Sequence, residues 1–388
     1  MPVQLRFFIG TLLWALPIFG QVQLRGLSFW NEPTLDIYQI DNHFSQEKKF
    51  LQRVSPDSMG IFNVQLDLQA ISTLQICGSN KCAMLYAQPK GHYLIELPLE
   101  EVQTYYNQDM QEIELLFYQL DTTDINYRIL GFEAWMDNYI ADIYQLKDIR
   151  SNEFILKVLA FKAETAAVYG NETNAFLRDY IKYSVGLTID NFSVVGGPSK
   201  EDKFEFYLQT DSVAYDQPKL IEYARLFYEA YDSQVDLNVR NAVQIALQAN
   251  SLDALIAALR QDPYIYNSSW AEFVALQLII ESEQTKRIAK DLSLALLRSL
   301  SIQGTQVGLR AAARFQLQQL SKLSDGEIWD AAQLSKEFGF SIASQQYVYL
   351  HHYIPGNQKC IAEMAALKRL AERYKNKVQI ITFYPSEL

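Results

Sequence analysis

The chain has 388 residues, 49% of them hydrophobic and 20% charged, which is enough apolar material for the cores of two or three domains. Its net charge of −11, with no cluster of Lys and Arg, argues against nucleic acid as a partner, because phosphates need basic side chains to neutralise them. The sequence contains no P-loop, no Gly-rich dinucleotide motif and no Ser-His-Asp arrangement, so we expect no cofactor.

The first 20 residues have the pattern of an export signal. Arg6 supplies the positive start, residues 7–19 carry no charge, and Gly20 is a small residue suited to cleavage. The apolar run is shorter than the roughly 20 residues that a membrane span needs, and no cysteine follows it to carry a lipid. The pattern therefore predicts a protein of the periplasm or cell exterior that is soluble after signal removal and can associate with the envelope. An N-terminal core segment is the alternative.

Residues 21–98 have the pattern of a β module. About seven short apolar runs recur at regular spacing, separated by turn signals such as residues 55–57 and 89–91. This spacing predicts a small antiparallel sandwich.

Cys77 and Cys82 flank a turn-rich tetrapeptide within this module. In a hairpin with a four-residue loop the two side chains face each other within disulfide range. A disulfide also suits an exported protein, so we predict a structural bridge, with two reduced strand thiols as the alternative.

Residues 99–325 read as a mostly helical region. Leu220, Tyr223 and Phe227 keep one apolar face over several turns, and Ser251 precedes another such stretch as an N-cap. No fixed period recurs, so the sequence does not predict a helical repeat array. Aromatic stripes of this kind are more typical of a packed core than of a cofactor site.

The C-terminal residues predict a strand, a tight turn, a helix and a second strand. Apolar runs at 347–350 and 378–383 flank the helical pattern, and Cys360 lies in its first turn. The crossover through the helix makes the two strands parallel.

This segment resembles the active-site half of a thioredoxin fold, specifically the TlpA/ResA-like extracytoplasmic thiol-disulfide oxidoreductases. That family carries a W-C-x-x-C turn followed by C-x-x-E-x-x-x-L-x-x-L and a strand after a K-V pair. Residues 54–66 and 87–97 also resemble the transthyretin-like module that precedes such domains in Bacteroidetes-type envelope proteins, and residues 320–342 resemble the family's lead-in. The resemblance implies a partial thioredoxin-like domain over 326–388. The matching residues are Cys360, Glu363, Leu367, Leu370, Lys377 and Val378.

The nucleophilic cysteine of that family is replaced here by Asn357. Asparagine cannot attack a disulfide, but it is one of the best N-cap residues. A former redox turn would then have become a capped helix start, with Cys360 as a buried, poorly reactive thiol; a working single thiol is the alternative.

Two histidines, His351 and His352, end the first strand of this segment. Adjacent strand residues point to opposite faces, so at most one could approach Cys360. A His–Cys metal site would need a further ligand, and none has suitable spacing, so we expect no bound metal.

A thioredoxin fold continues beyond this unit with a hairpin, which carries a cis-proline, and a last helix. Leu388 comes only five residues after Phe383. We therefore expect either a truncated sequence or a decayed domain.

Together these patterns predict a multi-domain α+β protein: export signal, β-sandwich, helical region and partial α/β thioredoxin-like unit. The favoured function is a redox-inactive or redox-impaired protein that binds an envelope polypeptide. One alternative is a thiol-disulfide oxidoreductase that works through Cys360 alone. The other places the function in the helical region, as a binding surface for a secreted substrate.

Overall fold

The computed structural model divides the chain into two compact units, Met1–Ser321 and Lys322–Leu388. It describes residues 21–99, 111–146, 151–192, 198–321, 347–353, 358–375 and 377–383. Four sequence-based predictions concern residues outside these ranges: the export signal, Asn357 as a helix cap, the boundary at 325/326 and the truncation at Leu388.

The first unit begins with two β-sheets. One has the strand order β4-β1-β7-β9 and the other β3-β2-β5-β6-β8. Their strands are β1 (Gln21–Ser28), β2 (Leu35–Ile40), β3 (Lys48–Val54), β4 (Ile61–Asp67), β5 (Ser72–Cys77), β6 (Lys81–Ala87), β7 (His92–Leu97), β8 (Gln111–Glu112) and β9 (Leu116–Gln119).

Both sheets are mixed, which corrects the prediction of a purely antiparallel sandwich. β1 pairs antiparallel with β4 but parallel with β7, and β6 pairs parallel with β8. A parallel pair needs a long crossover connection, and β2 to β6 all lie between β1 and β7 in the sequence. Alternation of apolar and polar side chains fixes which face of a strand is buried, but not the direction of its neighbour.

Side chains from both sheets share one apolar core. β1 and β4 alternate between exposed and buried residues, so each turns one face to the core. β6 differs, because six of its seven residues are buried. Leu85 belongs to the core of the sheets, whereas Tyr86, on the opposite face, packs in a helical core.

β8 pairs with β6 only at Lys81 and Cys82, and farther along β6 a side chain takes the place of a partner strand. Asn126 Nδ2 donates to the carbonyl oxygen of Tyr86 (2.6 Å), and the Tyr86 amide donates to Asn126 Oδ1 (2.9 Å). The Tyr86 ring packs against Phe176 and Tyr180, with centroids 5.3 and 5.8 Å away. A side-chain amide thus satisfies backbone groups that an edge strand would otherwise leave open.

From Ile125 onward, the described residues of the first unit are mostly helical, as predicted. Ser251 is the N-cap of α8, and its side chain accepts a hydrogen bond from the Ala254 amide, in agreement with the sequence-based prediction. No helix in the described ranges is long and apolar enough to cross a membrane. The helices are α1 (Ile125–Tyr144), α2 (Asn152–Tyr169), α3 (Ala175–Phe192), α4 (Lys200–Tyr207), α5 (Pro218–Phe227), α6 (Tyr231–Gln234), α7 (Leu237–Gln248), α8 (Leu252–Leu259), α9 (Ser268–Gln284), α10 (Lys290–Gln303) and α11 (Val307–Leu320).

These helices enclose two apolar cores. The smaller one is formed by α1, α2 and α3 together with Tyr86 of β6. The larger one contains Phe44, Tyr183 of α3 and residues from α4 to α11, and it surrounds the fully buried Trp270 and Phe273 of α9. Each core therefore combines several helices that are marginal on their own.

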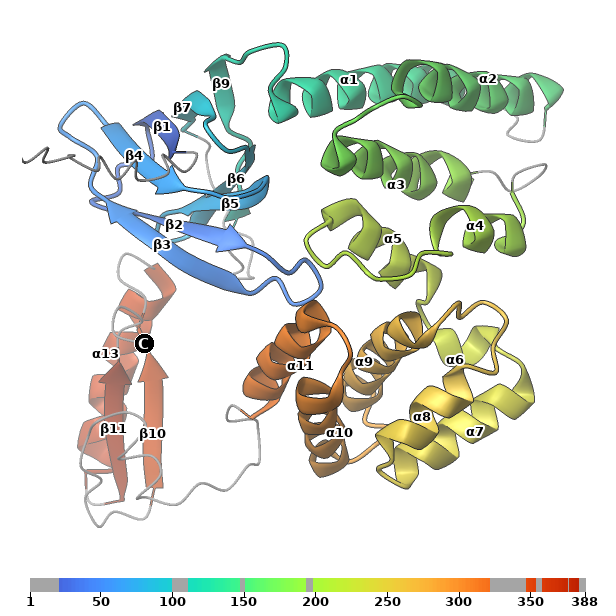
Figure 1. The fold of residues 1–388 in the computed structure, drawn as a ribbon. Coiled ribbons are helices and arrows are strands. Elements are labelled where there is room, and N and C mark those ends of the chain that lie inside the picture. The colour runs from blue at the N-terminus through green and yellow to red at the C-terminus, as the bar shows by residue number, and fades with distance from the viewer. Residues whose placement is uncertain are drawn as a thin grey trace, which may run out of the picture. The chain divides into compact units, whose positions relative to one another are not determined.

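The connection between β2 and β3 inserts into the larger helical core (Figure 1). The Phe44 ring meets the Phe273 ring edge to face, with centroids 5.2 Å apart. Asn42 Nδ2 donates to the carbonyl oxygen of Gly308 (2.7 Å), and the His43 amide donates to that of Tyr215 (2.8 Å). The β-sheets and the helices are thereby joined through buried contacts.

The second unit is a βαβ arrangement, as the sequence predicts. β10 (Tyr347–His352) and β11 (Val378–Phe383) run parallel, with Tyr347 opposite Val378 and His352 opposite Phe383. α13 (Gln358–Arg373) connects them and packs against β11. Leu367 is buried, whereas Ile361 and Leu370 are more than 40% exposed, so the two described strands cover only part of the helix's apolar face.

We predict that His43 makes the first unit sensitive to mild acid. Its side chain is 5% exposed, and burial lowers its pKa from 6.5 to about 4. The unfolded chain therefore binds a proton between these two values while the folded chain does not, so stability is full above pH 6.5 and falls as the pH drops toward 4. Linkage gives a loss of about 2 kcal/mol in the free energy of unfolding between pH 6.5 and 5.

Urea unfolding at pH 7 and pH 5 measures this loss. His43→Gln should reduce the difference between the two pH values by about 2 kcal/mol, whereas His92→Gln, at an exposed position of β7, should leave it unchanged. An equal pH dependence in wild type and His43→Gln would contradict the assignment.

Candidate functional site

Cys360 lies in the first turn of α13, where the sequence predicts it. The helix begins at Gln358, so Cys360 is its third residue, and its side chain is 4% exposed. The other two cysteines of the chain are bonded to each other in the first unit. Cys360 therefore has no second thiol within the chain with which to form a dithiol pair.

His351, on β10, faces α13. Its Nε2 lies 3.7 Å from Glu363 Oε2, and its Nδ1 lies 3.4 Å from Thr382 Oγ1 on the neighbouring strand. The imidazole is 5% exposed, while the Glu363 side chain is 48% exposed. The 3.7 Å separation is too long for a hydrogen bond but allows an ion pair when the imidazole is protonated.

Glu363 lies near Cys360 on α13. Cys360 and Glu363 are three residues apart, which places them on the same side of α13. The unit thus presents a buried thiol, a buried imidazole and a carboxylate from two adjoining elements. The side chain of His352 lies outside the described residues, so the prediction that only one histidine can approach Cys360 stays a prediction.

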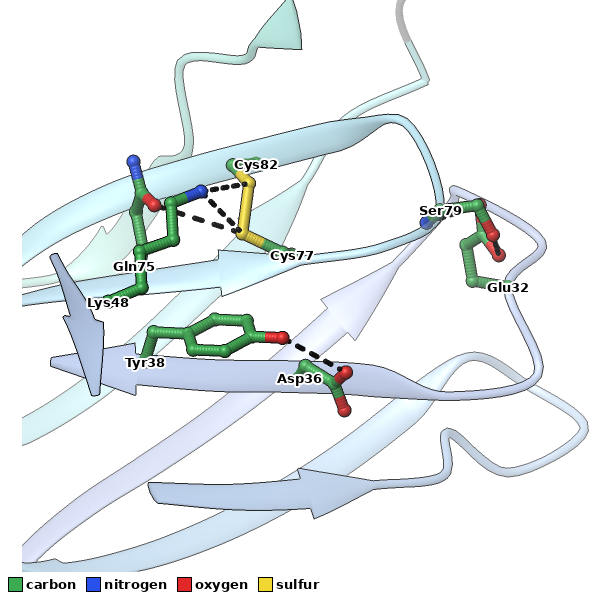
Figure 2. The surroundings of a disulfide bond; sticks show 8 residues. All are labelled: Glu32, Asp36, Tyr38, Lys48, Gln75, Cys77, Ser79 and Cys82. Carbon is green, nitrogen blue, oxygen red and sulfur yellow. Dashed lines mark hydrogen bonds between the residues drawn. A yellow bond between two sulfur atoms is a disulfide. The ribbon is translucent and has the colours of Figure 1, made fainter. Parts of the chain in front are cut away.

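The second cysteine site is the bond between Cys77 and Cys82 (Figure 2). Cys77 ends β5 and Cys82 lies at the start of β6, directly opposite each other in the register. Both side chains are buried, at 4% and 2% exposed. The hairpin geometry that the spacing predicts is the one observed, and a bond of this kind is consistent with an oxidising compartment.

A lysine covers the disulfide. Lys48 Nζ lies 3.7 Å from Cys82 Sγ and 3.9 Å from Cys77 Sγ, as Figure 2 shows. Burial lowers the pKa of Lys48, and the nearby charge of Glu112 opposes that effect. The alkyl chain and ammonium of Lys48 thereby shield the sulfur atoms from one side.

Polar contacts also fix the turn next to the disulfide. Glu32 accepts hydrogen bonds from the Ser79 amide (3.2 Å) and hydroxyl (2.7 Å), and a Cβ at Gly78 would come within 2.9 Å of Glu32 Cγ. On β2, Asp36 accepts two hydrogen bonds from Arg53, which hold the pKa of Asp36 below its usual value. These contacts fix the residues around the disulfide, as expected for a bond with a structural role.

One buried charge network was not predicted from the sequence. Asp190 of α3 is 1% exposed; its carboxylate pairs with Lys162 Nζ of α2 (2.9 Å) and accepts from the Tyr207 hydroxyl of α4 (2.8 Å). Burial, together with the Asp190 charge, raises the pKa of Tyr207, so the phenol stays a neutral donor. The network ties three helices together, and its members are too far apart in sequence to leave a motif.

Comparisons with known proteins identify no family for the chain. No protein-family model matches the chain, and no curated protein matches it either. Within the described residues, no group of three or more His, Cys, Asp or Glu side chains is placed to hold a metal ion.

We predict that the protein, when produced in an oxidising compartment, carries the Cys77–Cys82 bond and that this bond stabilises the first unit. Because the closed loop is short, replacing both residues by alanine should lower the free energy of unfolding by about 2 kcal/mol, at the lower end of the usual range. Peptide mapping by mass spectrometry without reductant identifies the link.

Cys360→Ala is the matched control, since it removes the third thiol and should leave the link intact. Recovery of both Cys77 and Cys82 in alkylated form, without reductant, would contradict the prediction.

Proposed function

We propose that the protein is an exported, thioredoxin-like protein of the bacterial envelope that binds polypeptide and does not catalyse dithiol exchange. The observation that carries the proposal is the distribution of its three cysteines. Two are bonded to each other in the first unit, and the third, Cys360, is buried at the start of α13. Dithiol exchange needs an attacking and a resolving thiol in one site, and the second unit holds one cysteine.

The resemblance to TlpA/ResA-like proteins supports the thioredoxin-like part of this proposal. The parallel β10–α13–β11 arrangement agrees with the active-site half of that fold. By the sequence resemblance, Cys360 corresponds to the family's resolving thiol. Asn357 stands where the family has its nucleophile. The export signal and the Cys77–Cys82 bond fit a periplasmic or secreted location.

Binding of an extended polypeptide is supported by β10. Among the described strands, β10 pairs with β11 alone, so its other edge has no partner strand within the described residues. An extended peptide can bind such an edge as an added strand. Tyr347 and Tyr349 project from this strand and are 64% and 50% exposed. An edge with exposed aromatic side chains can bind a peptide through backbone hydrogen bonds and ring contacts.

A single-thiol enzyme is the second candidate, and the His351–Glu363 pair favours it. An imidazole beside a carboxylate is a suitable acceptor for a thiol proton. The Cys360 thiolate would attack a partner disulfide, form a mixed disulfide and release the partner's other sulfur as a thiolate. An external thiol would then have to resolve the mixed disulfide.

We expect the purified protein not to accelerate the reduction of insulin by dithiothreitol. At pH 7 iodoacetamide should alkylate Cys360 on the order of tenfold more slowly in the folded protein than in urea, because the buried thiol reacts only after local opening. Asn357→Cys supplies the missing thiol and should raise insulin reduction above the wild-type level. Rapid alkylation near pH 6, or a mixed disulfide trapped with an envelope protein, would instead establish the single-thiol enzyme.

Peptide binding is tested with fluorescently labelled, reduced and carboxymethylated lactalbumin, which stays unfolded and has no disulfide to exchange. Tyr349→Glu should weaken its binding about tenfold in an anisotropy titration, as expected for loss of an aromatic anchor. Tyr266→Glu, at a position in the helical region that is 45% exposed, is the matched control and should bind like wild type. Equal affinities for the two variants would remove the β10 edge from the proposal.

A further inference from the structure

A second candidate binding site lies in the helical part of the first unit. A hollow of about 210 Å³ opens between α4, α5 and α6. Its wall combines two cationic, one amide and three apolar or aromatic side chains. They are Lys200, Lys203, Tyr223, Leu226, Phe227 and Gln234.

Lys200 is held in place by aromatic rings. Its ammonium lies 4.8 Å from the centroid of the Tyr264 ring and 5.5 Å from that of Phe227. It also donates a hydrogen bond to Gln234 Oε1 (3.3 Å). Aromatic faces attract a cation without neutralising it, so the positive charge of Lys200 is positioned and still available to an anion.

Lys203 adds a second positive charge on the same side of α4, because it follows Lys200 by three residues. Neither ammonium lies within ion-pair distance of a carboxylate in the described part of the chain. The neighbouring Asp202 is engaged elsewhere, since it accepts hydrogen bonds from the amide and the hydroxyl of Ser199 in the cap of α4. Two unneutralised lysines at one hollow stand out in a chain whose net charge is −11.

The floor of the hollow is aromatic. Tyr223 is 2% exposed, and its ring stacks with that of Phe227 at a centroid distance of 6.3 Å. The Tyr223 hydroxyl is buried and has no hydrogen-bond partner among the described residues. Leu226, 43% exposed, extends the apolar wall toward solvent. An apolar group can therefore lie below the two ammonium groups.

We propose that this hollow binds a small carboxylate that carries an apolar ring or chain. The two lysines would receive the carboxylate, while Phe227 and Leu226 would contact the apolar part. The volume is below the range of about 300–1,000 Å³ that drug-sized ligands occupy, which limits the ligand to roughly the size of one amino acid. The same chemistry is offered by a free organic acid and by the carboxyl terminus of a peptide that ends in an apolar residue.

Phenylacetate and phenylacetamide test the charge requirement, because they share a ring and differ in the carboxylate. Calorimetric titration of the full secreted chain at low salt should give a dissociation constant of about 1 mM or tighter for phenylacetate. The amide should bind at least about tenfold more weakly, since it cannot make charge-assisted hydrogen bonds. Absence of binding by phenylacetate, or equal binding of the two compounds, would overturn the proposal.

Variants locate the binding. Lys200→Gln and Lys203→Gln should each weaken phenylacetate binding roughly tenfold. Lys219→Gln is the matched control: Lys219 lies on α5 but outside the hollow, where it pairs with Glu222 at 3.0 Å, and its loss should leave the affinity unchanged. Unaltered affinity in both hollow variants would place the ligand elsewhere and overturn the assignment.

Competition by peptides distinguishes a free organic acid from a peptide's carboxyl terminus as the ligand. Acetyl-Gly-Phe with a free carboxyl terminus should compete with phenylacetate more strongly than its amidated form if the hollow accepts peptide ends. Failure of both peptides, with phenylacetate still bound, would assign the hollow to free acids. Neither result depends on α13 or β10, so the test is independent of the proposed function of the second unit.

Discussion

The insertion of the β2–β3 connection into the helical core is the contact on which the first unit depends. Phe44 is buried against Phe273, and burial of a phenylalanine side chain stabilises the fold by about 2–3 kcal/mol. Asn42 makes the insertion possible, because its oxygen accepts from the amides of Phe44 and Ser45 while its nitrogen donates to Gly308. A Cβ at Gly308 would lie 2.5 Å from the Tyr215 ring, so this close approach requires glycine.

The two units differ in the reactive groups that they carry. The first is a scaffold of three apolar cores with a bonded cysteine pair and a lysine-lined hollow, whereas the second combines a buried thiol with the His351–Glu363 pair. The two sites also differ in how far the sequence alone reveals them. Cys360, His351 and Glu363 come from one short stretch of βαβ pattern, whereas the hollow is assembled from three helices that a single sequence does not place together.

The sequence correctly predicted the features that depend on residues close together in the chain. The seven main strands, the cap at Ser251, the Cys77–Cys82 hairpin and the C-terminal βαβ order all follow from side-chain period, turn residues and spacing. The parallel pairing of β1 with β7 depends on which sheet the intervening strands join. The Asp190 network and the insertion of Phe44 depend on contacts between distant residues, and a single sequence does not reveal such contacts.

The burial of β6 on both faces also affects how the first unit unfolds. Leu85 belongs to the core of the sheets and Tyr86 to a helical core, so neither core can open without uncovering apolar surface of the other. Elements coupled in this way tend to exchange their amide hydrogens together, as one cooperative block. The sheets and the helices of this unit are therefore expected to behave as a single folding unit, although the sequence changes from β to α pattern near residue 99.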